Sequence, residues 1–266
     1  MHFGVNLAPF GEWSDPRVVG VLAKEAEAAG WDGFFLWDHL NWDRWGPQIG
    51  DPWMGLAAAA HQSERMRLGT VVTPVFRRRP AELARQTTSL QQLCQGRLIL
   101  GVGLGAPDPQ ESLDLGEEGR LDLRARMTDE FLELLVKLWS GRPVVHRGAF
   151  YRLKTRGFVP VPPVPIPIWI AATFPFRPGP LARAARYQGL VPASFDRALR
   201  PEELAPLARP GQQLVAGAWT GLDRARDRDL VESYREAGVT WWLEPLEPWR
   251  ASLAELRRRL QAGPPR

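Results

Sequence analysis

The sequence is poor in cysteine and histidine, and these shortages narrow the kinds of site that it can hold. Its single cysteine, Cys94, lies in a helical pattern, so we expect a core residue and neither a disulfide framework nor a cysteine-based zinc site. The four histidines are His2, His39, His61 and His146, and no two of them have the spacing of metal ligands. We therefore expect no metal site.

A long apolar run and a strong charge of one sign are also missing. The most apolar stretch, 161–172, is short and interrupted by prolines, so it is not expected to cross a membrane. The net charge is only +4, from 34 basic and 30 acidic residues, and no base-reading motif accompanies it. The first residues enter a strand without the pattern of an export signal. We expect a cytoplasmic protein that binds neither nucleic acid nor membrane.

Two local patterns allow more than one interpretation. The basic run Arg77-Arg78-Arg79 follows a predicted strand, and it is either a solvated loop or a contact for an anionic cofactor or substrate. Gly101, Gly103 and Ala106 fit the dinucleotide fingerprint G-x-G-x-x-A after a strand. Pro107 interrupts the place where the helix of that fingerprint should begin. We therefore favour glycines that let a flat ring approach the backbone.

What the chain does contain is a regular alternation of strands and helices. Apolar runs that predict buried strands alternate with segments of helical periodicity, and several of these segments open on a capping residue and end at glycine. The expected strands begin near residues 3, 33, 68, 97, 166, 189, 213 and 239. Strict alternation implies parallel strands, and eight such units in about 250 residues are typical of a TIM (β/α)8 barrel. An open doubly wound sheet is the alternative.

No change of composition marks a second domain, so we expect one domain over residues 1–266. The alternation breaks only after the fourth strand, where residues 104–165 form an insertion. This insertion is predicted to contain a loop rich in glycine, proline and acidic residues, an amphipathic helix over about 121–139, and a hairpin over 144–151.

The strand near residue 33 runs straight into ionisable groups, Asp38 and His39. The carboxyl ends of barrel strands are where active sites are built. His39 is our candidate for a catalytic proton donor or acceptor, because an imidazole needs little tuning to work at neutral pH. A histidine that is hydrogen-bonded for structural reasons is the alternative. Asp38 would orient His39 or cap the turn.

Other candidate residues lie where the remaining strands end. They are Asn6, Thr70, Thr73, Leu104, Gly105, Ala106, Ala172, Thr173, Ser194, Trp219, Thr220 and Glu244. The loop after the second strand is also rich in tryptophan, with Trp37, Trp42, Trp45 and Trp53. These rings either pack the barrel mouth or form an aromatic, water-poor pocket for an organic ring or an apolar substrate.

Several segments taken together resemble the bacterial luciferase-like family of flavin- and deazaflavin-dependent oxidoreductases. Their order and spacing agree with that family through about residue 195. The segments are Trp37-Asp38-His39, the strand 68–74 (LGTVVTP), the helix start 79–86 (RPAELARQ), the strand and turn 95–105 (QGRLILGVGLG), and 148–151 (GAFY).

The resemblance implies a TIM barrel with insertions, which agrees with the independent strand count. It implies reduced FMN or the deazaflavin coenzyme F(420) at the barrel mouth, a small-molecule substrate, and a histidine at position 39 that is catalytic in some deazaflavin enzymes. A non-proline cis peptide is expected at Val71-Val72, against the ring. Family members often form dimers, so a homodimer is one expectation. The residues expected to contact the cofactor are Asn6, Thr70, Val71, Val72, Gly103, Leu104, Gly105, Ala172, Thr173 and Arg177.

The sequence departs from the family pattern at two places. Deazaflavin dehydrogenases of the family often carry Gly-Glu after the fourth strand, where this chain has Gly105-Ala106; Glu111 is nearby but is not an aligned substitute. The usual glycine pair after the fifth strand is replaced by Ala171-Ala172-Thr173, although Arg177 could supply a phosphate contact. A cofactor-binding or accessory barrel subunit that has lost catalysis, and a lyase or hydrolase without a redox cofactor, therefore stay as alternatives.

Overall fold

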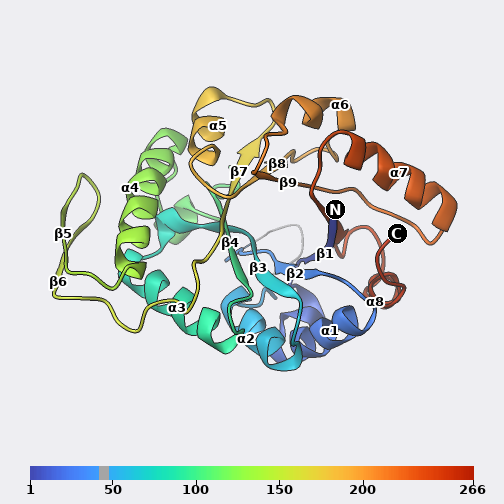
Figure 1. The fold of residues 1–266 in the computed structure, drawn as a ribbon, viewed down its shortest axis with the longest axis horizontal. Coiled ribbons are helices and arrows are strands. Elements are labelled where there is room, and N and C mark those ends of the chain that lie inside the picture. Colours follow the sequence, from blue (N-terminus) through green and yellow to red (C-terminus); the bar gives the residue numbers. More distant parts are fainter. Residues whose placement is uncertain (42–47) are drawn as a thin grey trace.

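The computed structural model describes residues 1–41 and 48–266, and its centre is a closed barrel of parallel strands (Figure 1). The barrel strands are β1 (His2–Leu7), β2 (Gly33–Leu36), β3 (Arg67–Pro74), β4 (Leu98–Gly103), β7 (Ile168–Thr173), β8 (Gly189–Ala193), β9 (Gln213–Ala216) and β10 (Trp241–Leu246). Their order around the barrel is β1-β10-β9-β8-β7-β4-β3-β2. The expected TIM barrel is confirmed, and the open doubly wound sheet is wrong.

Helices surround the barrel as an outer ring (Figure 1). They are α1 (Pro16–Ala28), α2 (Pro52–Gln62), α3 (Pro80–Leu93), α4 (Leu121–Trp139), α5 (Pro178–Ala184), α6 (Pro201–Leu204), α7 (Arg224–Glu236) and α8 (Leu253–Gln261), with the 3-10 turns η1 (Gly11–Ser14), η3 (Val75–Arg77), η4 (Leu113–Leu115) and η5 (Ala205–Leu207). Asp15 and Asp51 accept backbone hydrogen bonds at the starts of α1 and α2, as the sequence predicts. Among the described residues, no helix combines the length and apolarity that a membrane span needs.

The segment between β4 and β7 contains the predicted helix and hairpin. Helix α4 joins the outer ring beside α3, while β5 (Val144–Arg147) and β6 (Arg152–Thr155) pair antiparallel and project away from the barrel (Figure 1). Nε2 of His146 lies 2.9 Å from Oε1 of Glu130 on α4, which fastens the hairpin to that helix. α4 therefore occupies the position of a barrel helix, and the hairpin is an addition to the repeating pattern.

The barrel interior is filled by large side chains at one level and lined by small ones nearer the carboxyl ends of the strands. The inner cluster consists of Phe35, Ile99, Trp169, Val191, Val215, Trp241 and Leu243. Glycines on the inner face allow neighbouring strands to approach closely. A Cβ on Gly101 would lie 2.1 Å from the carbonyl oxygen of Thr70, and one on Gly217 would lie 1.9 Å from that of Leu243. Glycine is therefore required at both positions, because the backbone of the neighbouring strand lies too close for any side chain.

The close approach at Gly101 predicts a large loss of stability in Gly101→Ala. The added methyl group would meet backbone, which cannot rotate away, so the free energy of unfolding should fall by about 1–3 kcal/mol or more. The matched control is Gly179→Ala on α5, where no heavy atom lies within 4 Å of the added Cβ. Urea unfolding of both variants checks this, and equal stabilities would contradict the packing described.

Candidate functional site

The loop after β2 carries Asp38, whose carboxylate is held by two arginines. Nη2 of Arg77 donates to Oδ1 at 2.8 Å and to the Asp38 carbonyl oxygen at 2.7 Å, and Nη2 of Arg78 donates to Oδ2 at 2.7 Å. Both arginines follow β3, so these bonds fasten the loop after β2 to turn η3. Both oxygens of Asp38 are therefore engaged by the turn, and the expected role of this residue in orienting His39 finds no support in these bonds.

The other arm of Arg77 reaches a third loop. Nη1 donates to Oε1 of Glu111 at 2.6 Å, and the Glu111 carboxylate also accepts the backbone N–H groups of Leu40 at 3.1 Å and Asn41 at 3.0 Å. One guanidinium thus links the loops after β2, β3 and β4. The side chain of Arg77 is only 3% exposed, so the interpretation of this arginine as part of a solvated loop is wrong. Its partners here are two carboxylates of the protein.

Both carboxyl groups of this network are ionised at neutral pH. Burial opposes the charge on Asp38, but Arg78 and Arg77 outweigh it and hold its pKa below the ordinary value. Burial opposes ionisation of Glu111 as well, but the hydrogen bond and charge of His39, with the hydrogen bonds from Arg77 and the backbone N–H of Asn41, lower its pKa to about 2. Neither group is therefore a proton donor at neutral pH.

His39 lies at the mouth between this network and a group of aromatic rings. Its Nδ1 is 3.4 Å from Oε1 of Glu111, and its side chain is 16% exposed. The ring centroids of Phe10 and Trp37 lie 6.1 and 5.6 Å from that of the imidazole, and Trp249 packs on Trp37 at 5.4 Å. These aromatic side chains come from the loops after β1, β2 and β10. The imidazole is therefore partly buried, with a carboxylate at Nδ1.

The tryptophan-rich loop is only partly described. Trp42 and Trp45 lie outside the described residues. Trp53 is buried at the start of α2, where the guanidinium of Arg78 lies 5.5 Å from its ring centroid. Trp53 therefore packs against Arg78, while Trp37 is the described tryptophan of this loop that packs beside the imidazole.

Asn6, Val71 and Val72 lie toward the carboxyl ends of their strands. Among the described residues, none makes a hydrogen bond with Oδ1 of Asn6, although this atom is buried. The Val71-Val72 peptide is cis, as the resemblance implied. Val71 packs against the inner cluster, and Val72 carries the methyl group that a Cβ on Gly103 would meet at 2.4 Å. An acceptor to which no described residue donates thus lies near the end of β1. It is two residues beyond Gly4, where an added Cβ would meet Phe35 and Leu243 of the inner cluster.

Two of the expected cofactor contacts face away from the interior. The hydroxyl of Thr70 donates to the carbonyl oxygen of Gly101 at 3.2 Å and is fully buried. The Ala172 side chain belongs to the outer core under the helices, while Ala171 packs against the inner cluster. Because strand side chains alternate, only Ala171 presents a methyl group to the interior. Contacts of Thr70 or Ala172 with a cofactor stay predictions, and they would involve backbone atoms.

The remaining predicted contacts lie around the rim. Gly103 is restricted by Val72, and Gly105 has a left-handed φ of +76°, so chain geometry already requires glycine at both positions. Thr173 is exposed at the end of β7, and Arg177 is exposed at the residue before α5. These four positions stay candidates for cofactor contact, and so does Leu104, whose carbonyl oxygen accepts a hydrogen bond from Arg124.

Sequence reasoning missed Arg124, which fixes the loop after β4. This arginine on α4 is 2% exposed, donates from Nη1 to the carbonyl oxygens of Leu104 at 3.3 Å and Ala106 at 3.1 Å, and lies over the ring of Phe76. The available signal was its position, because residues 124, 128, 131 and 135 lie on one helical stripe and are all buried.

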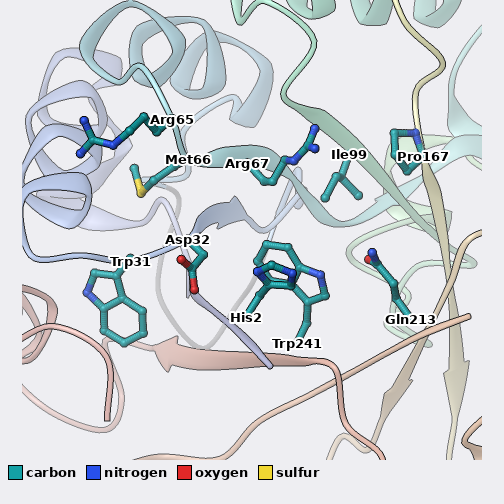
Figure 2. A pocket seen from close by; sticks show the side chains of 10 residues that line it. All are labelled: His2, Trp31, Asp32, Arg65, Met66, Arg67, Ile99, Pro167, Gln213 and Trp241. Carbon is teal, nitrogen blue, oxygen red and sulfur yellow. The ribbon is translucent and has the colours of Figure 1, made fainter. Parts of the chain in front are cut away.

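A cavity of about 310 Å³ opens at the opposite end of the barrel (Figure 2). Its lining includes His2, Arg67, Gln213 and Trp241, which are the first residues of β1, β3, β9 and β10. Figure 2 also shows Trp31 and Asp32 beside it. Active sites of TIM barrels lie at the carboxyl ends of the strands, so this cavity is not the candidate site.

Comparisons with known proteins point to one family. A model described as luciferase-like monooxygenase matches residues 1–198. The chain is 34% identical over 206 residues to an F(420)-dependent glucose-6-phosphate dehydrogenase from Beutenbergia cavernae, a match that covers 74% of this chain and 58% of the relative. The chain thus spans less than two thirds of the length of that relative.

Two solved structures extend the likeness. An F(420)-dependent secondary alcohol dehydrogenase, in complex with an F(420)-acetone adduct, superposes with a TM-score of 0.78 at 19% identity, covering 99% of this chain and 98% of the other. A monooxygenase from Streptomyces bottropensis gives a TM-score of 0.59 at 25% identity, covering 90% of this chain and 66% of the other. The first of these likenesses, at its low identity, shows the fold alone.

The lowered pKa of Glu111 predicts a specific dependence of stability on pH. Because its folded pKa of about 2 lies below the ordinary 4.5, the unfolded chain binds the proton first as the pH falls. The stability that Glu111 contributes is therefore present above about pH 4.5 and lost as the pH falls toward 2. Between about pH 5 and pH 3, wild-type protein should lose up to about 1.4 kcal/mol per pH unit more than Glu111→Gln. The measurement is urea unfolding of both proteins at several pH values. Free energies of unfolding that fall equally with pH in the two proteins would contradict this prediction.

Proposed function

Because the chain belongs to the luciferase-like monooxygenase family, we propose that it is an oxidoreductase whose redox step is carried by a ring cofactor at the barrel mouth. The cofactor is coenzyme F(420) or FMN. The F(420)-dependent relative from Beutenbergia cavernae favours F(420). The reaction is hydride transfer with F(420), and monooxygenation of a small organic molecule with FMN.

The observation that carries this proposal is the buried Oδ1 of Asn6, to which no described residue gives a hydrogen bond. A buried acceptor without a donor is costly, so an acceptor held at a barrel mouth suits a ligand that brings the donor. Both the isoalloxazine and the deazaflavin ring carry an imide N–H, which is a donor of this kind. The residues present therefore fit a ring of either type.

The loss of the glycine pair after β7 obstructs this site less than the sequence suggested. Of the two alanines, Ala172 turns its methyl group into the outer core, and only Ala171 presents one to the interior. The Arg177 side chain is exposed beyond this strand and could bind a cofactor phosphate. The departure therefore concerns one methyl group.

The bound cofactor would exchange a hydride with the substrate or activate oxygen, and the chain would supply binding, orientation and proton handling. His39 would hold or release a proton on its imidazole, since Asp38 and Glu111 are already ionised carboxylates. Phe10, Trp37 and Trp249 would keep water away from the ring and shape the substrate pocket.

The remaining parts of the proposal concern the surroundings of the protein. We place it in the cytoplasm, acting on a small-molecule substrate and without nucleic-acid or membrane partners. The buried free thiol of Cys94 is in keeping with a reducing compartment. A homodimer stays a prediction.

Asn6→Ala should weaken cofactor binding without lowering stability. Because no described residue donates to this buried acceptor, removing it should leave the free protein as stable or more stable. The complex loses a hydrogen bond, so Kd should rise about tenfold. Titration of F(420) and of FMN, followed by absorbance, checks this. Gln92→Ala, on the exposed face of α3, is the control. If neither cofactor binds the wild-type protein, the accessory barrel or the cofactor-free lyase or hydrolase replaces this proposal.

His39→Ala should leave cofactor affinity nearly unchanged and lower turnover by about 10²- to 10⁴-fold, the range expected for loss of a general acid or base. The control is His61→Ala, because His61 is exposed on α2. Steady-state rates with the cofactor that binds check this. Unchanged turnover in His39→Ala would remove the proposed catalytic role.

A further inference from the structure

Glu111 brings to the mouth a carboxylate that the sequence pattern did not place there. Its Oε1 lies 3.4 Å from Nδ1 of His39, and its side chain is 4% exposed. We propose that Glu111 is the positioning residue of His39: it holds the imidazole in the tautomer that carries its hydrogen on Nδ1, so that Nε2 bears the lone pair that exchanges a proton. This inference rests on the proposed function and deepens it, by naming the residue through which His39 is oriented.

The position of the carboxylate is set by groups other than the imidazole. Arg77 donates to Oε1 at 2.6 Å, and the backbone N–H groups of Leu40 and Asn41 donate from the loop after β2. Arg77 is itself held by Asp38. Groups other than the imidazole thus hold the Glu111 carboxylate in place. The ring takes its orientation from this carboxylate, as a metal-binding histidine does from the carboxylate that accepts its other N–H.

The chemistry of the pair selects one tautomer. An ionised carboxylate can only accept hydrogen bonds, so the ring nitrogen that faces it carries a hydrogen. Asp38 is adjacent in sequence, but both its oxygens accept from Arg77 and Arg78. Phe10 and Trp37 pack around the imidazole and restrict its rotation. Among the residues that the structure describes, Glu111 is therefore placed to set the tautomer.

A purely structural role for Glu111 is the competing account. By accepting the N–H groups of Leu40 and Asn41, the carboxylate would hold the loop after β2 whatever the state of His39. Loss of stability in a variant would agree with both accounts. The tautomer of His39 distinguishes them, because a structural role alone does not require the hydrogen to be on Nδ1.

The test is a measurement of imidazole tautomers in the cofactor-free protein labelled with ¹⁵N-histidine. The chain has four histidines, and His39→Gln identifies the signal of His39. At about pH 9, where a neutral imidazole predominates, long-range ¹H–¹⁵N spectra report which nitrogen carries the hydrogen. We expect His39 to be almost wholly in the Nδ1–H form in wild-type protein, and to shift toward the Nε2–H form in Glu111→Gln.

The matched control is Glu130→Gln. Glu130 forms the other Glu–His pair, with Nε2 of His146 on the hairpin at 2.9 Å, so this change should alter only the His146 signals. Unchanged His61 and His146 signals in Glu111→Gln would show that the variant is folded. Glu111→Asp, which keeps a carboxylate, should retain more of the Nδ1–H form than Glu111→Gln and serves as the second variant if Glu111→Gln does not fold.

Two results would overturn the proposal. One is a wild-type His39 with its hydrogen on Nε2, and the other is a His39 whose tautomer is the same in wild type and in the folded Glu111 variants. Neither result depends on a bound cofactor. Failure of F(420) and FMN to bind would remove the proposed function while leaving this tautomer measurement intact, so the two failures are distinguishable.

Discussion

The mouth of this barrel depends on the guanidinium of Arg77. Its two arms reach Asp38 and Glu111, so one side chain from the turn after β3 fixes the loops after β2 and β4. With Arg78, the network contains two cations and two carboxylates in a largely buried space. Breaking a buried pair leaves an uncompensated charge, which costs about 3–5 kcal/mol, so such a network holds its geometry firmly. His39 lies at the edge of that network, where its Nδ1 faces the Glu111 carboxylate.

The residues that stabilise the barrel and the residues of the candidate site lie in different parts of the structure. The inner cluster around Trp169 and Trp241 fills the interior, and the outer core joins the strands to the helices. Nearer the carboxyl ends the inward side chains are small or polar, as at Ala171 and Asn6. The pairing of a rigid, packed barrel with a mouth of loops is what lets the ends of several strands contribute to one site.

The fold could be predicted from the sequence in most respects, because strand and helix patterns are local. The Asp-Pro starts of α1 and α2, the eight strands and helix α4 all lie close to where the periodicity placed them. The direction in which each strand side chain points could not be predicted in the same way, because it depends on the register of strand pairing. A shift of one residue would exchange Ala171 and Ala172 between the inner and outer faces, and an apolar run does not specify that register.

The site was predictable only in part, because its partners are distant in the chain. His39 follows a strand and could be placed at the mouth by counting. Glu111 could not, because it reaches the imidazole through an irregular loop, across a separation of 72 residues from His39. Three consecutive arginines also look alike in sequence. Only the turn η3 determines that Arg77 is buried between two carboxylates while Arg79 is exposed.

The central claim is that a flavin or deazaflavin ring binds at the carboxyl ends of the strands, beside Asn6 and His39. The most direct measurement is a crystal structure of the protein grown with F(420), and in parallel with FMN. The account predicts a ring that donates a hydrogen bond to Oδ1 of Asn6, packs against Val71-Val72 and lies next to the imidazole. A ring bound elsewhere, such as in the cavity of Figure 2 at the opposite end of the barrel, would contradict it.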